Sequence, residues 1–417
     1  VVIGFTYLIN LDVAFSIWFF HILGFLETGL FNYWQYGTAA GGDAYSSGHS
    51  YVNHQSMGGV IALVVVGLWI SRKHILAVFK KAFGGEVPEL DDAEEPLSYR
   101  WTVIILIAAS MFCTGWLMHM GMSWWAALVF LALCMILYIG ATRVVCEGGI
   151  VFVQACMIPQ TFMLRSFGSK ALGHTNLVVL SLSFMWMADF TSVFMPNLAN
   201  SMKIADAVGS RRKKWLFPTV IAVIIVVFVV TSGIIFNLSY NLPQRSGSYK
   251  WYFGEDGHIK WACEYAVRPI DELNKIEKQD EEAEKWYKNA AAKWPFDNLR
   301  YQDLSKNTFS RSEKAQYFSD IRVKQRRKYS IQPQRWLFTA IGFFIMAFLM
   351  LMRNRFLWWP LHPVGFPFAT APSILRIWFS IFLGWLIKLL IIKYGGAKLF
   401  NRLKPVFMGL IVGGIIG

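Results

Sequence analysis

The chain is poor in charged residues, in cysteines and in short catalytic motifs. Only 16% of its 417 residues are charged, whereas soluble domains carry about a quarter. It has five cysteines and no Cys-x-x-Cys pair, so neither a disulfide framework nor a zinc site is predicted. A P-loop, a GxSxG elbow, an HExxH pair and a GxGxxG turn are all absent. Their absence excludes the enzyme classes that depend on them, and the chain is not expected to be an enzyme.

Long apolar runs stand in place of these motifs. Hydrophobic residues make up 55% of the chain, and residues 217–238 contain no charged side chain. A helix of that length spans roughly 33 Å, enough to cross a hydrocarbon core of about 30 Å. The sequence therefore predicts an all-α fold, a polytopic transmembrane helix bundle of about 8–10 helices. The expected spans are residues 1–26, 56–70, 101–118, 124–141, 150–164, 177–198, 215–238, 336–352, 374–392 and 406–416.

The apolar runs divide the chain into three regions. Residues 1–238 are expected to form an N-terminal transmembrane bundle, and residues 334–417 a C-terminal transmembrane region. Residues 239–333 are expected to form an extramembrane loop. Apolar residues at helical spacing within it predict an amphipathic helix. Because the sequence begins and ends inside apolar runs, further sequence is expected at both ends.

Basic residues outnumber acidic ones, 40 against 26, which gives a net charge of +14. They gather at the ends of the expected helices, where such residues set topology and contact anionic headgroups. The lipid bilayer is therefore the expected partner. Nucleic acid is not, because no groove-reading motif is present. With residues 72–100 inside, the expected spans place Arg353 inside but residues 393–404 outside, and a re-entrant segment would remove this conflict.

Three acidic residues lie within or beside expected spans: Asp12, Glu147 and Asp189. An ionised carboxylate in hydrocarbon costs at least about 2.5–3.5 kcal/mol, so such residues face a cavity or a partner and often relay protons. We therefore consider all three as transport or proton-relay candidates. Asp189 is the foremost, because it lies near the middle of an expected span. The alternative is a structural ion pair or a place at a helix end.

The stretch from Glu147 to Pro159 predicts an interruption. Gly148 and Gly149 each weaken a helix by roughly 1 kcal/mol, and Pro159 removes a backbone donor. We expect a broken or re-entrant helix here, with these three residues and Gln154 as substrate-site candidates, because transporters place substrates at such breaks. The alternative is a glycine pair that lets two helices pack closely.

Two groups of residues contain side chains that can bind metals. His49 and His54 lie in a loop at a spacing that does not suit one helix face, and residues 118–122 combine Met with His119 at a membrane interface. Neither group supplies a convincing ligand set, so no metal and no cofactor are predicted.

The C-terminal part carries the most specific signature. Trp358-Trp359-Pro360-Leu361-His362-Pro363-Val364-Gly365 is followed by residues 385–388, 394–396 and 402–405. With residues 15–18 and 143–149, this pattern resembles an uncharacterised bacterial family of polytopic membrane proteins that carry paired domains of unknown function. That family is distantly similar to oligopeptide transporters. The resemblance implies inverted or repeated halves, proton-coupled uptake of small peptides or metal chelates, and a bacterial inner-membrane location. Lys388 is a further candidate, as a buried cation that pairs with Asp189 or Glu147 or reaches the interface.

Three functional hypotheses follow. The leading one is a secondary transporter whose intramembrane carboxylates bind or relay protons. The second is a non-transporting scaffold or complex subunit that docks a partner through residues 239–333. The third is a membrane-embedded enzyme acting on lipid or cell-wall precursors.

Overall fold

The computed structural model describes residues 1–34, 36, 46, 48–85, 87, 90, 95–150, 153–187, 194–207, 215–241, 333–356 and 358–416. Within these residues the regular structure is helical and no β-strand forms. The elements are α1 (Val2–Leu8), α2 (Leu11–Tyr33), α3 (Ser50–Ile70), α4 (Arg72–Ala82), α5 (Tyr99–His119), α6 (Trp124–Gly148), α7 (Pro159–Phe167), α8 (Ser169–Leu182), α9 (Phe184–Met187), α10 (Phe194–Ala207), α11 (Leu216–Asn241), α16 (Pro333–Arg355), the short helix η4 (Pro363–Gly365), α17 (Pro372–Leu390), the π-turn η5 (Ile391–Gly395) and α18 (Gly396–Ile416).

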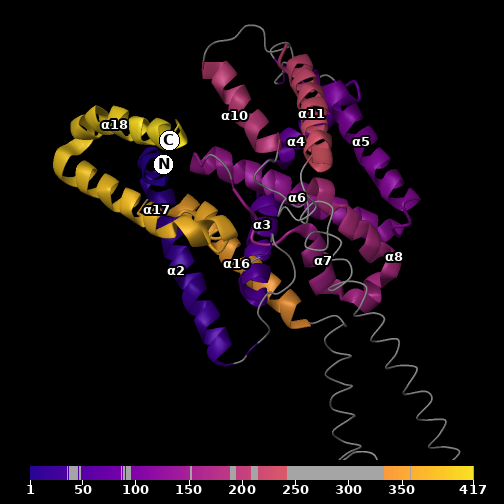
Figure 1. The fold of residues 1–417 in the computed structure, drawn as a ribbon, viewed down its shortest axis with the longest axis horizontal. Helices are drawn as coiled ribbons and strands as arrows, with labels where there is room; N and C mark the ends of the chain where they lie inside the picture. Colours follow the sequence, from indigo (N-terminus) through magenta and orange to yellow (C-terminus); the bar gives the residue numbers. More distant parts are fainter. Residues whose placement is uncertain are drawn as a thin grey trace, which may run out of the picture.

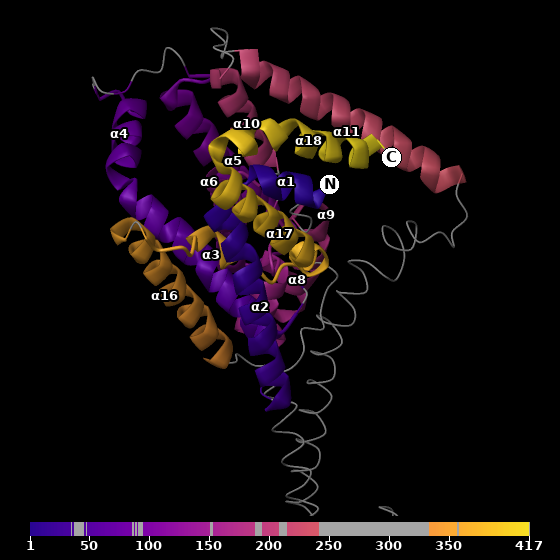
Figure 2. The same ribbon diagram turned by 90° about the vertical axis from the view of Figure 1, so that its left-hand side faces the viewer.

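Seven helical stretches in the described part are long and apolar enough to cross a membrane. The protein is therefore a multi-pass membrane protein, as the apolar runs predict. Figures 1 and 2 show α3 and α6 inside the assembly, with α11 on its outside. The two termini lie close together, where α1 meets α18 (Figure 1).

The bundle is organised around the crossing of α3 and α16, the most extensive helix contact in the described part. Tyr51 contacts the start of α16 and Gly58 meets it further along, so the two helices run in the same direction. A Cβ atom on Gly58 would lie 1.9 Å from the Thr339 carbonyl oxygen, and one on Gly342 would lie 2.0 Å from the Gln55 carbonyl oxygen. Only glycine permits this approach of the two backbones.

The predicted interruption after Glu147 is present. α6 ends at Gly148, and Gly149 adopts the left-handed conformation (φ 65°) that caps a helix C-terminus. Residues 153–158 are not helical, and α7 begins with Pro159 at its first turn, where the missing N–H costs nothing. In the described part of the expected span 150–164, an irregular segment, residues 153–158, is therefore followed by the short helix α7.

A second irregular segment joins α16 to α17. Residues 358–371 fold back into the protein, with Pro363, Val364 and Ala371 buried. α17 then runs antiparallel to α2, with Trp378 stacked on His21 at one level and Lys388 bonded to Ile9 at another. α17 thus returns to the end of the bundle that α16 has just left. A segment that folds back in this way would remove the charge conflict in the expected topology, and we call residues 358–371 the re-entrant segment.

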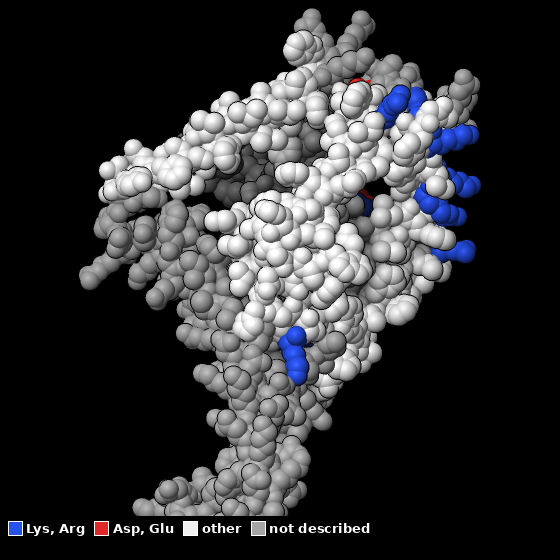
Figure 3. Space-filling view, turned by 90° about the vertical axis from the view of Figure 1, so that its right-hand side faces the viewer, with Lys and Arg blue, Asp and Glu red and all other residues white. Residues whose placement is uncertain are grey.

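We call the end where α3 and α16 terminate the basic end. α4 places Arg72, Lys73, Lys80 and Lys81 there, α16 adds Arg353 and Arg355, and η5 and α18 follow from α17. Figure 3 shows Lys and Arg gathered along one edge, whereas the rest of the described surface on that face is largely uncharged. By the positive-inside rule the basic end is predicted to face the cytoplasm.

Several expected boundaries were wrong. The expected span 1–26 divides at Asn10, whose side chain caps α2 by accepting from the Asp12 backbone N–H. The span 56–70 begins six residues earlier, at Ser50. In the expected span 177–198, a turn at Ser183 separates α8 from α9, and residues 188–193 lie outside the described part. Gly173 (φ 76°) breaks α8 before that span begins. Asp189 and the predicted amphipathic helix lie outside the described residues.

Candidate functional site

One face of α2 carries polar side chains along most of its length. Asp12, Ser16 and Glu27 share this face, and Asp12 and Glu27 are separated by about 22 Å of helix rise. Ser16 Oγ accepts from the His362 N–H at 2.6 Å. Gln55 Nε2 donates to Glu27 Oε1. The polar face therefore meets the re-entrant segment at one level and α3 at another.

The two irregular segments meet between α2 and α3. Cys156 Sγ lies 3.4 Å from the Pro367 carbonyl oxygen and 3.3 Å from Thr370 Oγ1, which lies 3.3 Å from Ser56 Oγ. His21 Nδ1 bonds the Ala369 carbonyl at 2.9 Å. Backbone that is not helical needs such partners inside a membrane protein, because no water or ladder satisfies it. Polar atoms from four parts of the chain therefore converge at this depth.

Two ion pairs lie at the basic end, and we call their four side chains the charge cluster. Arg353 Nη2 pairs with Asp12 Oδ2 at 2.8 Å, and Arg143 Nη2 pairs with Glu147 Oε1 at 2.5 Å. Asp12 and Glu147, two of the predicted acidic candidates, both act electrostatically on the same histidine, His362. Each side chain in the two pairs is between 29% and 39% exposed, so the pairs themselves contribute little stability.

His362 lies outside the seven apolar stretches. Its Nδ1 accepts from the Val364 N–H at 3.3 Å and caps η4. Burial lowers the pKa of His362, Arg353 lowers it further, and Glu147 and Asp12 act in the opposite direction. Because the cap needs an unprotonated Nδ1, folding favours the neutral imidazole.

Lys388 does not pair with Glu147, which has Arg143 as its partner. Its ammonium group donates to the Ile9 carbonyl, beside the break between α1 and α2. It also lies 5.2 Å from the centre of the Phe400 ring. The buried lysine is therefore accommodated by a freed backbone carbonyl and an aromatic face.

The opposite end, where α3 and α16 begin, holds a second polar group. His54 is fully buried and its Nδ1 lies 3.2 Å from Thr339 Oγ1. Arg335 Nη1 donates to the Arg165 carbonyl at 2.7 Å, and Tyr51 donates to Gln334 at 2.8 Å. Polar groups thus follow the bundle from one end to the other.

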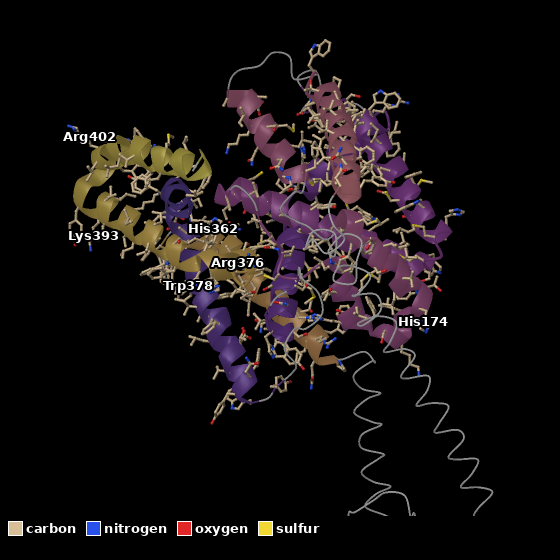
Figure 4. All side chains as sticks on the ribbon, viewed as in Figure 1. His174, His362, Arg376, Trp378, Lys393 and Arg402 are labelled. Atoms are coloured by element: carbon tan, nitrogen blue, oxygen red, sulfur yellow. The ribbon has the colours of Figure 1, made fainter. Side chains whose placement is uncertain are left out.

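A cavity of about 510 Å³ opens beside the meeting of the two irregular segments. Its walls are mostly apolar side chains of α1, α2 and α17, and its polar lining includes Gln154, Ser373 and Arg376. Figure 4 shows His362, Arg376 and Trp378 close to where α17 passes α2, and Lys393 and Arg402 beyond them. Gln154, a predicted substrate-site residue, therefore faces an open space.

Comparison with protein families matches residues 1–286 and 300–416 to DUF6785, a family of unknown function. The chain belongs to this family. No curated protein and no solved structure matches it.

The structure of this DUF6785 chain separates the predicted site residues into groups. Asp12 and Glu147 pair with arginines and both act electrostatically on His362. Gly148 and Gly149 end α6, and Pro159 begins α7. Gln154 lines the cavity, and Lys388 bonds to Ile9. Within the described residues, no group of three or more His, Cys, Asp or Glu side chains is arranged to hold a metal ion.

The sequence alone did not identify Glu27, His21 and Arg335 of this DUF6785 chain as candidates. Glu27 stands one residue beyond the expected span 1–26, although the apolar run resumes after it and α2 continues to Tyr33. That resumption was the available signal. No local signal identifies Arg335, because its position depends on the packing of α16 against α7.

Proposed function

We propose that this protein is a secondary transporter that couples the movement of a small polar solute to protons. The observation that carries the proposal is the polar face of α2, which meets the re-entrant segment and α3 over about 22 Å of helix. A lipid-facing or purely structural helix has no need of two carboxylates and a hydroxyl on one face at successive depths.

The meeting of two irregular segments supports the same proposal. In transporters, substrate and ions bind where helices break, because freed backbone groups and helix ends are available there. Here residues 153–158 and 358–371 meet at Cys156 and Thr370, next to a cavity of about 510 Å³. Such a space suits a small solute such as a short peptide or a metal chelate, the two classes implied by the resemblance to oligopeptide transporters.

The test is solute-driven proton flux into proteoliposomes of the full-length protein, screened with di- to tetrapeptides and metal chelates. At least one class is expected to acidify the lumen. Glu27→Gln keeps a side chain that can bond Gln55 but cannot ionise, so we expect it to reduce proton flux at least tenfold while the protein remains folded. Gly233→Ala on α11, where an added Cβ meets nothing within 4 Å, is the control.

Flux that is equal in Glu27→Gln and wild type would remove the polar face from the mechanism. If no solute in the panel drives proton flux although the protein is folded, the result would instead favour the scaffold hypothesis. Asp189 remains a relay candidate on sequence grounds alone, and Asp189→Asn belongs in the same assay.

A further inference from the structure

Arg335 lies at the end of the bundle opposite the basic end, where α3, α7 and α16 meet. Its Nη1 donates to the Arg165 carbonyl, and the neighbouring Trp336 indole donates to the Ser166 carbonyl at 3.0 Å. These bonds fix the start of α16 against the last turn of α7. They use one of the five N–H donors of Arg335, and its Nε is buried without a hydrogen-bond partner.

His54 presents a second unsatisfied atom near this guanidinium. Thr339 Oγ1 donates to the Arg335 carbonyl at 2.9 Å, so toward His54 it can only accept. His54 Nδ1 therefore carries the proton, and the fully buried Nε2 has no partner. Both Arg335 and Arg165 act electrostatically on this ring. Ser50, one helical turn before His54 on the same face, also has a buried hydroxyl without a hydrogen-bond partner.

Among the residues that the structure describes, no carboxylate pairs with Arg335. The ion pairs among the described residues are Arg143 with Glu147 and Arg353 with Asp12, both at the basic end. The nearest acid along the polar face, Glu27, bonds Gln55. Arg165 lies close enough to repel the charge of Arg335. A buried cation without a counter-ion is costly, and a ligand that supplies negative charge would offset that cost.

We infer that Arg335 and His54 form a binding site for an oxyanion, the carboxylate or phosphate group of the transported solute. A guanidinium matches both groups through parallel N–H bonds, and the Ser50 hydroxyl can donate a further one. His54 Nε2 carries no proton, so it can only accept a hydrogen bond, from the hydroxyl of a protonated carboxyl or phosphate group. The inference rests on the proposed function and narrows its substrates to solutes that carry an acidic group.

The experiment is thermal unfolding of the purified full-length protein, titrated with inorganic phosphate or with succinate. A saturable rise in the unfolding midpoint is expected for the wild type and for Arg402→Gln, which changes an exposed arginine at the basic end. Arg335→Gln is expected to weaken the apparent affinity at least tenfold. If that variant does not fold, Arg335→Lys keeps the charge but loses the fork of donors, and it is expected to weaken the affinity to a lesser degree.

Three results would overturn the inference. One is the absence of any saturable shift in the wild type, and another is an equal shift in the wild type and the folded Arg335 variant. The third is a shift with phosphatidylglycerol but with neither soluble anion, which would assign the site to a lipid headgroup. Proton-coupled flux of a neutral solute that neither anion inhibits would refute the oxyanion site and leave the transporter proposal intact.

Discussion

α3 and α11 are both long enough to span a membrane, yet they differ in almost every other respect. The α3 stretch has a mean hydropathy of 1.3 with 61% of it buried, whereas residues 217–238 of α11 have a mean hydropathy of 2.9 with none buried. α3 carries Asn53, His54, Gln55 and Ser56 inside the bundle, and α11 contains no Asp, Glu, Lys, Arg or His. Of the seven apolar stretches in the described part, the most hydrophobic is thus the one that the other described helices leave exposed, and the least hydrophobic is the one around which they pack.

This contrast follows from the solvent on each side. Lipid offers no hydrogen bonds, so a helix that faces it must be apolar throughout. A helix enclosed by others can hold polar side chains, provided that its neighbours pair with them. A high mean hydropathy therefore identifies the membrane-spanning helices. Polar residues within those helices then indicate where a candidate site lies.

Glycine substitution should give the largest difference between the two helices. Gly58→Leu places side-chain atoms where a Cβ alone would lie 1.9 Å from the Thr339 carbonyl oxygen. α3 and α16 would have to separate, and we expect destabilisation of more than about 3 kcal/mol, at or above the upper range of overpacking costs. On α11 an added Cβ at Gly233 meets nothing within 4 Å, so Gly233→Leu should be neutral. The yield of folded protein after detergent extraction measures both, and equal yields would show that α3 and α16 do not cross as described.

An introduced charge should be costly on α11, the helix that tolerates the glycine substitution. Ile225, in the middle of α11, is 57% exposed. Ile225→Asp is expected to reduce membrane insertion by about 2.5–3.5 kcal/mol, since lipid offers the carboxylate no partner. Ile225→Asn is the matched uncharged variant and should cost less. Insertion can be followed by glycosylation mapping. Unimpaired insertion of the aspartate variant would indicate that α11 faces a polar space and would end the contrast with α3.

Local backbone chemistry was the most predictable part of the fold. Gly148, Gly149 and Pro159 predict the break after α6 because conformational freedom and a missing N–H act within a few residues. The start of α3 was misjudged because Ser50 to Gln55 lower the local hydropathy. These polar residues are tolerated only because α7 and α16 enclose them, and that enclosure depends on residues far away in the sequence.

The acidic residues of the candidate site could be predicted from the sequence, but their ion-pair partners could not. Asp12 and Glu147 stand out because a carboxylate beside an apolar run needs a partner. That Arg353 pairs with Asp12, and that His362 lies within the influence of both acids, requires the re-entrant segment to fold back against α2. The distribution of basic residues in the sequence indicates that a re-entrant segment is needed. It does not indicate which residues form the turn.

The smallest expected effect is the dependence of the unfolding midpoint on pH. α11 has no acidic, basic or histidine side chain, so this dependence arises in the rest of the bundle. The folded protein lowers the pKa of His362, so the stability gained from its neutral form is present above the ordinary pKa of about 6.5 and is lost as pH falls through the lowered value. The unfolding midpoint should therefore decline on acidification. His362→Asn retains an N-cap acceptor without titrating, and should flatten this decline. His174→Asn, at an exposed histidine of α8, should not. An unchanged decline in His362→Asn would place the acid-sensitive group elsewhere than the charge cluster of Asp12, Glu147 and Arg353.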